Sequence, residues 1–435
     1  MALAETARRC RHPPRPDLDL FQKCYGFTRA KQVQAQGAYP YFIPITGSEG
    51  SEIDIRGHRL VMAGSNNYLG LTHHPHVLRA AHEAIDRYGS SCTGSRFLNG
   101  TLELHEELER RLARFLDREA ALCFSTGFQT NLGVISSLCG KNDVILCDRE
   151  NHASIFDGTR LSFAEVRKYR HEDMEDLERQ LQLASRPEVR GKLIIVDGVF
   201  SMMGEIANLP AISELAQQYG ARILVDEAHS TGVLGAQGRG AVEHCGVEAN
   251  VDLVLGTFSK SFASLGGFVA GPEPVIHYIK HHARSLIFSA SIPPSAAAAA
   301  LAALDVVETE PELRTRVLER AKQVRDGLAA LGFDVGRSTT PIVPVIVGDQ
   351  DRLFAFWKEL FEGGVFTNPV TVPAVPPNYD LVRTSYMASH TEEQCERVIG
   401  IFEQAGRKLG VIDRVDPRVD PKGARTRRRA AAGDV

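Results

Sequence analysis

The chain has 435 residues, of which 43% are hydrophobic and 24% are charged, and its formal net charge is −4. These values are ordinary for a large globular protein, and the small charge argues against a nucleic-acid partner. Eight cysteines occur without CxxC pairs or Cys/His clusters, which argues against a disulfide framework or a zinc site. The longest apolar stretch, around 295–304, is shorter than the ~20 residues that span a bilayer. Without the apolar segment of a signal peptide at the N-terminus, we expect a cytoplasmic protein.

The sequence divides into an N-terminal segment, two domains and a tail. Residues 1–60 end in a hairpin-like stretch, 51–61, with a turn at Arg56-Gly57. Residues 61–293 alternate β-rich runs with amphipathic helical patterns, which predicts a large α/β domain around a mainly parallel sheet. We expect its strands at 120–124, 144–147, 193–197, 223–226 and 253–256, and helices at 102–116 and 210–219.

Residues 294–412 predict a smaller α+β domain. A long helix from about Pro294 leads into it, and we expect strands at 342–347 and 381–385 and a helix at 392–409. Residues 413–435 are rich in Asp, Pro, Arg, Ala and Gly, which predicts a disordered basic tail. The arginines at 425 and 427–429 either stay solvated or touch anionic lipid weakly, and the sequence leaves both open.

A lysine follows the last strand expected in the large domain, in GTFSKS at 256–261. Ligands of open α/β sheets bind beyond the carboxyl ends of the strands, so this position favours a functional lysine. Thr257 and Ser259 could hydrogen-bond a phosphate while Lys260 forms a Schiff base with an aldehyde. For a lone lysine in a loop, a solvated charge is the alternative.

An aspartate and a histidine follow another expected strand, in DEAHS at 226–230. Asp226 lies where a carboxylate could pair with a protonated pyridine nitrogen, and His229 could hydrogen-bond a phenolic oxygen. A metal site is the rival interpretation, because DExH resembles a carboxylate–histidine ligand set. The sequence has no second His at i+4 and no Walker-A loop, which argues against a metal site and an ATPase.

Two further candidates lie earlier in the chain. Gly127, in STGFQ at 125–129, stands between a strand and a helix, where backbone amides could bind a phosphate. His152, in NHAS at 151–154, could stack on an aromatic ring. Taken alone, each is explained as well by a plain turn or a structural histidine. The whole series at successive sheet edges indicates a pyridoxal-phosphate (PLP) enzyme whose cofactor forms an imine with Lys260.

With these residues in place, the chain resembles the α-oxoamine synthase family of fold-type I PLP enzymes. The resemblance runs from about Tyr41 to Leu409. It is carried by SNNYLGL at 65–71, GSRFLNGT at 94–101, NHAS at 151–154, DEAHSTG at 226–232 and GTFSKS at 256–261. It implies an aminotransferase-like fold, with a large mainly parallel-sheet domain and a smaller C-terminal α+β domain, and a homodimer with shared active sites.

The resemblance also implies the roles of individual residues. Lys260 would hold the cofactor as an imine and serve as general base, Asp226 would pair with the pyridine nitrogen, and His229 with the 3′-oxygen. His152 would stack on the ring. The phosphate would be surrounded by Gly127, Phe128, Thr257 and Ser259 and by Ser289 and Ala290 of the partner subunit. The amino-acid substrate would contact Arg383, Asn67 and Tyr68. A surface salt bridge is the alternative for Arg383.

Members of this family join an amino acid to an acyl thioester and release carbon dioxide. The loop TFSKSFASLGGF, with Ser259 and Ser261, resembles the branch that forms 3-ketosphinganine from L-serine and palmitoyl-CoA. Met203, where many relatives have aspartate, agrees with that branch, whereas Phe128 stands where it often has tyrosine. We therefore expect L-serine and a long-chain acyl thioester. Alanine, glycine or an acyl-carrier-protein thioester remain alternatives, and a structural subunit is disfavoured because Lys260 is present.

Overall fold

The computed structural model describes residues 19–35, 37 and 39–412. The tail expected at 413–435 lies outside the described residues. Contacts divide the chain into two units, residues 1–43 and residues 44–435. In the first unit, the described residues form two short helices, α1 (Gln22–Tyr25) and α2 (Arg29–Ala35).

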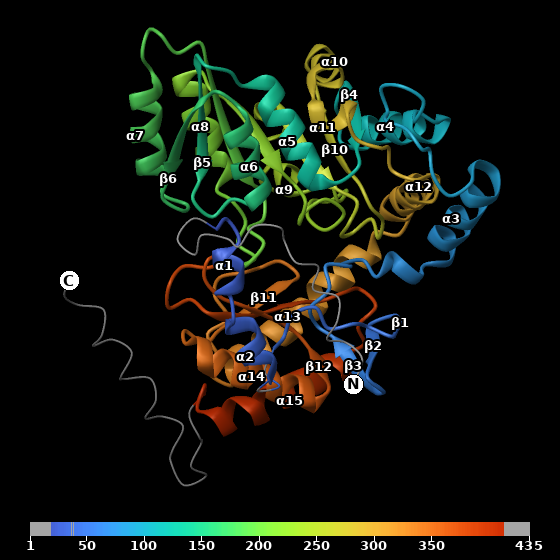
Figure 1. The fold of residues 1–435 in the computed structure, drawn as a ribbon, viewed down its shortest axis with the longest axis vertical. Helices are drawn as coiled ribbons and strands as arrows, with labels where there is room; N and C mark the ends of the chain where they lie inside the picture. Colours follow the sequence, from blue (N-terminus) through green and yellow to red (C-terminus); the bar gives the residue numbers. More distant parts are fainter. Residues whose placement is uncertain (1–18, 36, 38, 413–435) are drawn as a thin grey trace. The chain divides into compact units, whose positions relative to one another are not determined.

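A seven-stranded sheet forms the centre of the large domain (Figure 1). Its spatial order is β4 (Ala120–Phe124), β10 (Gly267–Gly271), β9 (Leu253–Thr257), β8 (Arg222–Asp226), β7 (Gly191–Asp197), β5 (Asp143–Asp148) and β6 (Glu165–Tyr169). β10 runs antiparallel to both its neighbours, β4 and β9, and the other pairs in this sheet are parallel, so the prediction of a mainly parallel sheet is confirmed. Two strands were not predicted: β6 is a partly exposed edge strand that contains charged residues, and β10 is bounded by glycines at both ends.

Helices cover both faces of this sheet, which is why its inner strands are apolar throughout. In β7, Ile194 and Val196 face one hydrophobic cluster, while Leu193 and Ile195 face another. The first cluster includes α3 (Pro75–Tyr88), α4 (Glu103–Phe115), α7 (Met174–Ala184), α8 (Leu209–Tyr219), α9 (Ala241–Cys245) and α12 (Pro294–Thr309). The second includes α5 (Gly127–Leu138), α6 (Ala153–Leu161), α10 (Glu273–His282) and α11 (Arg284–Ile287). Each buried aliphatic side chain contributes about 1.5–3 kcal/mol to this packing.

The C-terminal residues form a second, smaller core around a three-stranded antiparallel sheet. Its strands are β11 (Ile342–Ile346), β14 (Leu381–Ser385) and β13 (Asn368–Val370). They pack with α13 (Glu312–Ala330), α14 (Gln350–Gly363) and α15 (Glu392–Leu409). The expected strands and the last helix are confirmed. Thr391 and Gln394 form a capping box at the start of α15, and Gly410, with φ 67°, follows its end.

The hairpin expected at 51–61 is also confirmed. It consists of β2 (Glu52–Ile55) and β3 (His58–Met62), joined through Arg56 and Gly57, which both have positive φ. Together with β1 (Gly47–Glu49) and β12 (Val365–Phe366) they make a four-stranded sheet. Because β12 pairs in parallel with β3, this N-terminal hairpin shares a sheet with C-terminal residues.

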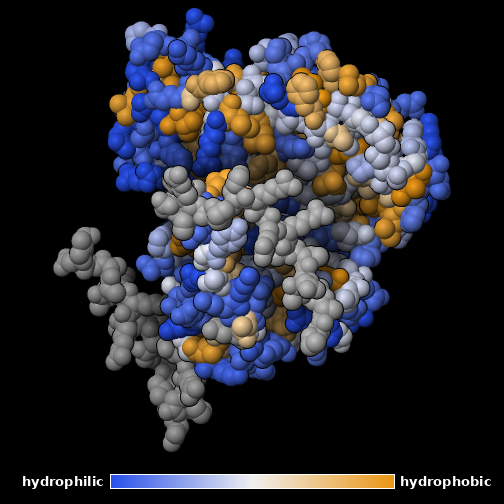
Figure 2. All heavy atoms as spheres, in the orientation of Figure 1, coloured by the Kyte–Doolittle hydropathy of each residue, from blue (hydrophilic) through white to orange (hydrophobic). Residues whose placement is uncertain are grey.

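The surface drawn in Figure 2 shows hydrophilic residues around separate hydrophobic patches. Of the described residues, no helix combines the length and apolarity needed to cross a membrane. The seven described cysteines are all unpaired, and four of them are buried.

Candidate active site

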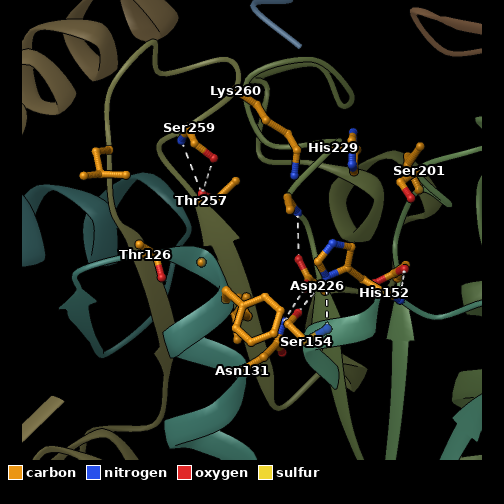
Figure 3. A pocket seen from close by; sticks show the side chains of 17 residues that line it. Thr126, Asn131, His152, Ser154, Ser201, Asp226, His229, Thr257, Ser259 and Lys260 are labelled. Carbon is orange, nitrogen blue, oxygen red and sulfur yellow. Dashed lines mark hydrogen bonds between the residues drawn. The ribbon is translucent and has the colours of Figure 1, made fainter. Parts of the chain in front are cut away.

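A cavity of about 290 Å³ lies beyond the carboxyl ends of β8 and β9 (Figure 3). The predicted residues that line it are Gly127, Phe128, His152, Asp226, His229, Thr257, Ser259 and Lys260. The other predicted residues, Asn67, Tyr68, Ser289, Ala290 and Arg383, lie outside this lining. Several polar residues absent from the prediction also line the cavity: Thr126, Asn131, Ser154, Asp197 and Ser201.

One end of the cavity is suited to an anion. The helix α5 begins at Gly127, and Thr126 caps it by accepting a hydrogen bond from the amide of Gln129 at 3.1 Å. A Cβ atom at Gly127 would lie 2.9 Å from the Cβ of Thr257, so only glycine fits this close approach. The hydroxyl oxygens of Thr257 and Ser259 lie 2.9 Å apart beside this turn. Helix-terminal amides and hydroxyl groups together form a phosphate-binding arrangement.

Lys260 reaches into the cavity from the loop after β9 (Figure 3). Its surroundings change its acidity. Burial lowers the pKa of Lys260 to about 8, although the carboxylates of Asp226 and Asp197 oppose the shift. A larger fraction of this amine is therefore uncharged near neutral pH than in an ordinary lysine, which makes it a nucleophile and a base.

Asp226 ends β8 and is 5% exposed. Its Oδ2 accepts a hydrogen bond from Nδ2 of Asn131 at 2.8 Å, and its Oδ1 accepts one from the amide of Ala228 at 3.0 Å. Asp197, the last residue of the neighbouring strand β7, lies opposite Asp226 in the strand register. Burial, with the charge of Asp226, raises the pKa of Asp197 well above its ordinary value. The site therefore presents two neighbouring carboxyl groups, and each of them accepts hydrogen bonds from the protein.

His152 stands at the N-terminal end of α6 and is fixed by contacts of its amide and its ring. Its amide donates to Oδ2 of Asp197 at 2.8 Å, and its Nδ1 lies 2.7 Å from the hydroxyl of Ser154. The ring of Phe128 approaches edge-on, with centroids 6.3 Å apart. Burial lowers the pKa of His152, which favours a neutral ring.

His229 belongs to a hydrogen-bonded chain with Tyr68 and Arg383. Nη2 of Arg383 donates to the Tyr68 hydroxyl at 3.4 Å, and this hydroxyl lies 2.6 Å from Nδ1 of His229. Burial, together with the charges of Lys260 and Arg383, lowers the pKa of His229 well below its ordinary value. Arg383 can only donate, so the Tyr68 hydrogen has two acceptors in reach, Nδ1 of His229 at 2.6 Å and Oδ1 of Asn66 at 3.3 Å, and the shorter contact favours donation to His229. This series of hydrogen bonds favours the tautomer of His229 that carries its proton on Nε2.

Arg383 is only 4% exposed, so the alternative of a surface salt bridge is wrong. Its Nε donates to the carbonyl of Ser201 at 2.6 Å, and its Nη2 donates to Oδ1 of Asn66 at 2.9 Å. Within the described part of the chain, no carboxylate forms an ion pair with it. A buried guanidinium held by neutral groups is suited to an anionic ligand.

The remaining predicted residues have other neighbours. The Ser289 hydroxyl lies 3.1 Å from Nε2 of Gln129, and the Ala290 carbonyl accepts a hydrogen bond from the Ser125 hydroxyl of the same chain. Both partners flank the turn at Gly127. The Asn67 side chain donates to the Thr72 hydroxyl at 2.9 Å.

Ser261, one of the two serines of the lysine loop, is buried and does not line the cavity. A Cβ atom at Gly232 would lie 2.9 Å from the Cβ of Ser261, so these residues pack against each other. Ser259, by contrast, does line the cavity. Any effect of Ser261 on substrate choice is therefore exerted through packing.

Known proteins are similar to this chain in both sequence and fold. Residues 60–402 match the family model "Aminotransferase class I and II". The chain belongs to this family. A serine palmitoyltransferase of Bacteroides ovatus is 48% identical over 393 residues, which cover 90% of this chain and 99% of that protein. An 8-amino-7-oxononanoate synthase of Treponema denticola is 41% identical over 396 residues, which cover 91% and 99%.

Solved structures agree with these relatives. A serine palmitoyltransferase of S. paucimobilis with a bound PLP–myriocin aldimine has a TM-score of 0.88 and 38% identity, covering 91% of this chain and all of that one. An 8-amino-7-oxononanoate synthase of Francisella tularensis has a TM-score of 0.68 and 27% identity, covering 79% and 97%. The expected membership of the α-oxoamine synthase family, with its fold-type I architecture, is therefore confirmed.

Proposed function

We propose that this chain is a PLP-dependent acyltransferase that joins L-serine to a long-chain acyl thioester, favoured to be palmitoyl-CoA. The serine Cα–H bond breaks and its proton is taken up by a base, a bond forms between the α-carbon and the thioester carbonyl carbon, the C–S bond breaks, and the thiol leaves. The serine carboxylate departs as carbon dioxide and the α-carbon takes up a proton. The product is an amino ketone of the 3-ketosphinganine type, which would place the enzyme in sphingolipid biosynthesis.

One observation carries this proposal: the Lys260 amine, the Asp226 carboxylate and the anion-binding turn at Gly127 line one cavity. This arrangement fits PLP. The amides at the start of α5 and the hydroxyls of Thr257 and Ser259 would hold its phosphate. Asp226, held by its own donors, would pair with the ring nitrogen. A serine palmitoyltransferase solved with PLP has the same fold, at a TM-score of 0.88.

When bound, PLP supplies an electron sink for the bonds that break at the amino-acid α-carbon. The residues of the chain supply the rest. Lys260, with its pKa lowered to about 8, is suited to bind the aldehyde and then to take the α-proton on Nζ. Asp226 would keep the pyridine nitrogen of the cofactor protonated. His229 would donate from Nε2 to the 3′-oxygen, and His152 would cover one face of the ring.

Arg383 would hold the carboxylate of the amino acid. Its hydrogen bonds to Ser201 and Asn66 fix the guanidinium, and it has no carboxylate partner among the described residues. A charged contact of this kind orients the α-carbon as well as binding it. Asn67 and Tyr68 were expected to contact the substrate, and Tyr68 would act by supporting Arg383 and His229.

The choice of L-serine rests on the relatives. Four of them named serine palmitoyltransferase are 46–48% identical to the chain. The 8-amino-7-oxononanoate synthases at 41% identity keep open the second candidate, another α-oxoamine synthase that uses alanine or glycine or an acyl-carrier-protein thioester. A structural subunit would not need the complete set of Lys260, Asp226 and His229.

The proposal includes a cytoplasmic homodimer. Large hydrophobic side chains are exposed on segments next to the phosphate end of the cavity, with exposed fractions of 56% for Phe97, 77% for Leu98 and 74% for Phe288. Ser95 and Ala290 pair in a β-bridge that joins these segments. A second copy covering this surface would bring the partner subunit's Ser289 and Ala290 towards the phosphate. The possible membrane contact of the tail at 413–435 stays a prediction.

A spectroscopic panel tests the function. The purified protein is loaded with PLP and titrated with L-serine, L-alanine and glycine while the visible spectrum of the bound cofactor is recorded. We expect serine to change it most. A response to alanine or glycine without one to serine would overturn the choice of donor. A protein that cannot be loaded with PLP would overturn the enzyme itself.

A second measurement tests the acyl donor. The loaded enzyme is given serine with palmitoyl-CoA or with palmitoyl-acyl carrier protein, and the product is followed by mass spectrometry. We expect 3-ketosphinganine and free coenzyme A from the first mixture. Product from the carrier-protein mixture alone would move the proposal to the second candidate.

A further inference from the structure

His171, two residues after the end of β6, lies between carboxylates from two other segments. Its Nδ1 is 3.0 Å from Oδ1 of Asp148, and its Nε2 is 3.3 Å from Oε2 of Glu205 and 3.7 Å from Oε2 of Glu150. The ring meets Phe200 edge-on, with centroids 4.4 Å apart at 90°. Because both ring nitrogens face protein carboxylates, His171 can influence a substrate only through other residues.

Asp148, the first of these partners, is fully buried at the end of β5. Its Oδ1 also accepts a hydrogen bond from the amide of Glu150 at 2.8 Å, and its Oδ2 accepts one from the amide of Glu172 at 2.9 Å. The segment that begins here continues to His152, whose amide is held by Asp197. His171 and Asp148 therefore fix the start of the loop that carries His152.

Glu205, the partner on the other side, closes a turn that begins at Phe200. The Phe200 amide donates to the Glu205 carbonyl at 2.9 Å, and the Gly204 amide donates to the Phe200 carbonyl at 2.8 Å. Ser201, within this turn, accepts the hydrogen bond from Nε of Arg383. The placement of this turn therefore helps to set the placement of Arg383.

We propose that His171 is a positioning residue of the active site: held between Asp148 and Glu205, its imidazole sets the spacing between His152 and Ser201. This inference rests on the proposed function. His171 lies outside the first cavity. It would align His152, which covers the cofactor ring, with Arg383, which holds the substrate carboxylate. His152, His171 and Ser201 all line a second cavity, of about 740 Å³, that adjoins the first.

The charge of the ring strengthens these contacts. Burial opposes protonation, but the hydrogen bond and charge of Asp148, with Glu150 and Glu205, outweigh it and raise the pKa of His171 to about 9. Other titratable groups face the cluster: Glu172, whose pKa burial raises to about 7, and Arg170, which pairs with Asp173. The folded pKa of His171 lies above its ordinary value, so the stabilisation is complete below about pH 6.5 and is lost as the pH rises through about 9.

The variant His171→Gln tests this role, because glutamine keeps a hydrogen-bond donor and loses the charge. We expect the PLP-loaded variant to bind serine about tenfold more weakly, the effect of losing one hydrogen bond to a charged group, with an unchanged PLP content. The ratio of the two affinities, variant to wild type, should approach one above about pH 9, where the wild-type ring is neutral. Serine affinity is read from the spectrum of the bound cofactor.

The same substitution at the exposed His244 is the matched control and should leave serine affinity unchanged. Equal serine affinity in His171→Gln and wild type, or a loss that stays constant from pH 7 to about 10, would overturn the proposal. If His171→Gln does not fold, Glu205→Gln takes its place, since it removes one contact and keeps the pair with Asp148. That variant should weaken serine binding less, and no change would contradict the proposal.

The test is independent of the proposed amino donor. Failure of the wild type to respond to serine contradicts the proposed function, and His171→Gln is then compared with wild type using whichever amino acid binds. A pH-dependent loss of affinity for that amino acid would still support the role of His171.

Discussion

Asp226, the last residue of β8, and Lys260, in the loop after β9, reach the active site from one sheet, whereas Arg383 reaches it from β14 in the smaller core. The contacts of the Asp226 carboxylate and the Thr257 hydroxyl lie within that sheet, the loop after β9 and the helix α5. Contacts of Arg383 span 182 residues to Ser201 and 317 residues to Asn66. Cofactor binding therefore depends mainly on the large domain, although His229 is linked through Tyr68 to Arg383, whereas the group that binds the substrate carboxylate itself belongs to the smaller core. Substitutions at the two ends should therefore separate the two functions.

The largest effect is expected at the cofactor end. Lys260→Ala removes the base and the amine that binds the aldehyde, and we expect activity to fall at least about 10²- to 10⁴-fold. Condensation of serine with palmitoyl-CoA, measured by thiol release, checks this. Lys358→Ala, at an exposed lysine of α14, is the control and should keep full activity. Activity of Lys260→Ala within tenfold of wild type would remove Lys260 from the chemistry.

At the carboxylate end, Arg383→Lys keeps the charge and loses the fork that contacts Ser201 and Asn66. We expect KM for serine to rise about 10- to 100-fold, as for a lost charged hydrogen bond of about 1.5–3 kcal/mol, while PLP content stays unchanged. Steady-state kinetics and the absorbance of the bound cofactor check both values. Loss of PLP from this variant would show that the two ends are not separable.

The acidity of Lys260 gives a test within the cofactor end. Its pKa of about 8 lies below the ordinary value. The fraction of Lys260 in the reactive, uncharged form therefore rises about tenfold per pH unit up to about pH 8 and then levels off. The rate at which the cofactor-free protein takes up PLP should follow this curve after correction for the titration of PLP itself. A rate that keeps rising to about pH 10.5 would contradict the lowered pKa of Lys260.

The smallest effect is expected for Phe128→Tyr. This side chain is 42% exposed and touches the His152 ring only edge-on. Adding a hydroxyl there should change the free energy of serine binding by no more than about 0.5 kcal/mol. Spectroscopic titration with serine checks this. A gain of tenfold or more would mean that the residue at 128 controls the choice of amino acid.

The same division explains what the sequence could predict. Lys260 and Asp226 were predictable because each follows an apolar run that forms a strand, and parallel strands bring their carboxyl ends together. Asp197 also ends such a run, and this signal was available but not used. Asn131 carries no such signal, because it lies inside a helix and faces Asp226 only once α5 packs on the sheet.

At the carboxylate end, the sequence motif SNNYLGL indicated the segment but not which asparagine contacts Arg383. Asn66 makes that contact, while Asn67 bonds to Thr72. The distinction depends on the local turn, where the Tyr68 amide donates to the Asn66 carbonyl. A contact between residues 317 positions apart follows from tertiary packing, which motif spacing does not encode.

The most direct test of the account is to map where the cofactor attaches. The PLP-loaded protein is reduced with borohydride, digested, and its peptides are analysed by mass spectrometry. We expect one labelled site, Lys260, and no label on any peptide of Lys260→Ala. A label on another lysine of the native protein, or the absence of any label, would contradict the assignment of this cavity as a PLP site.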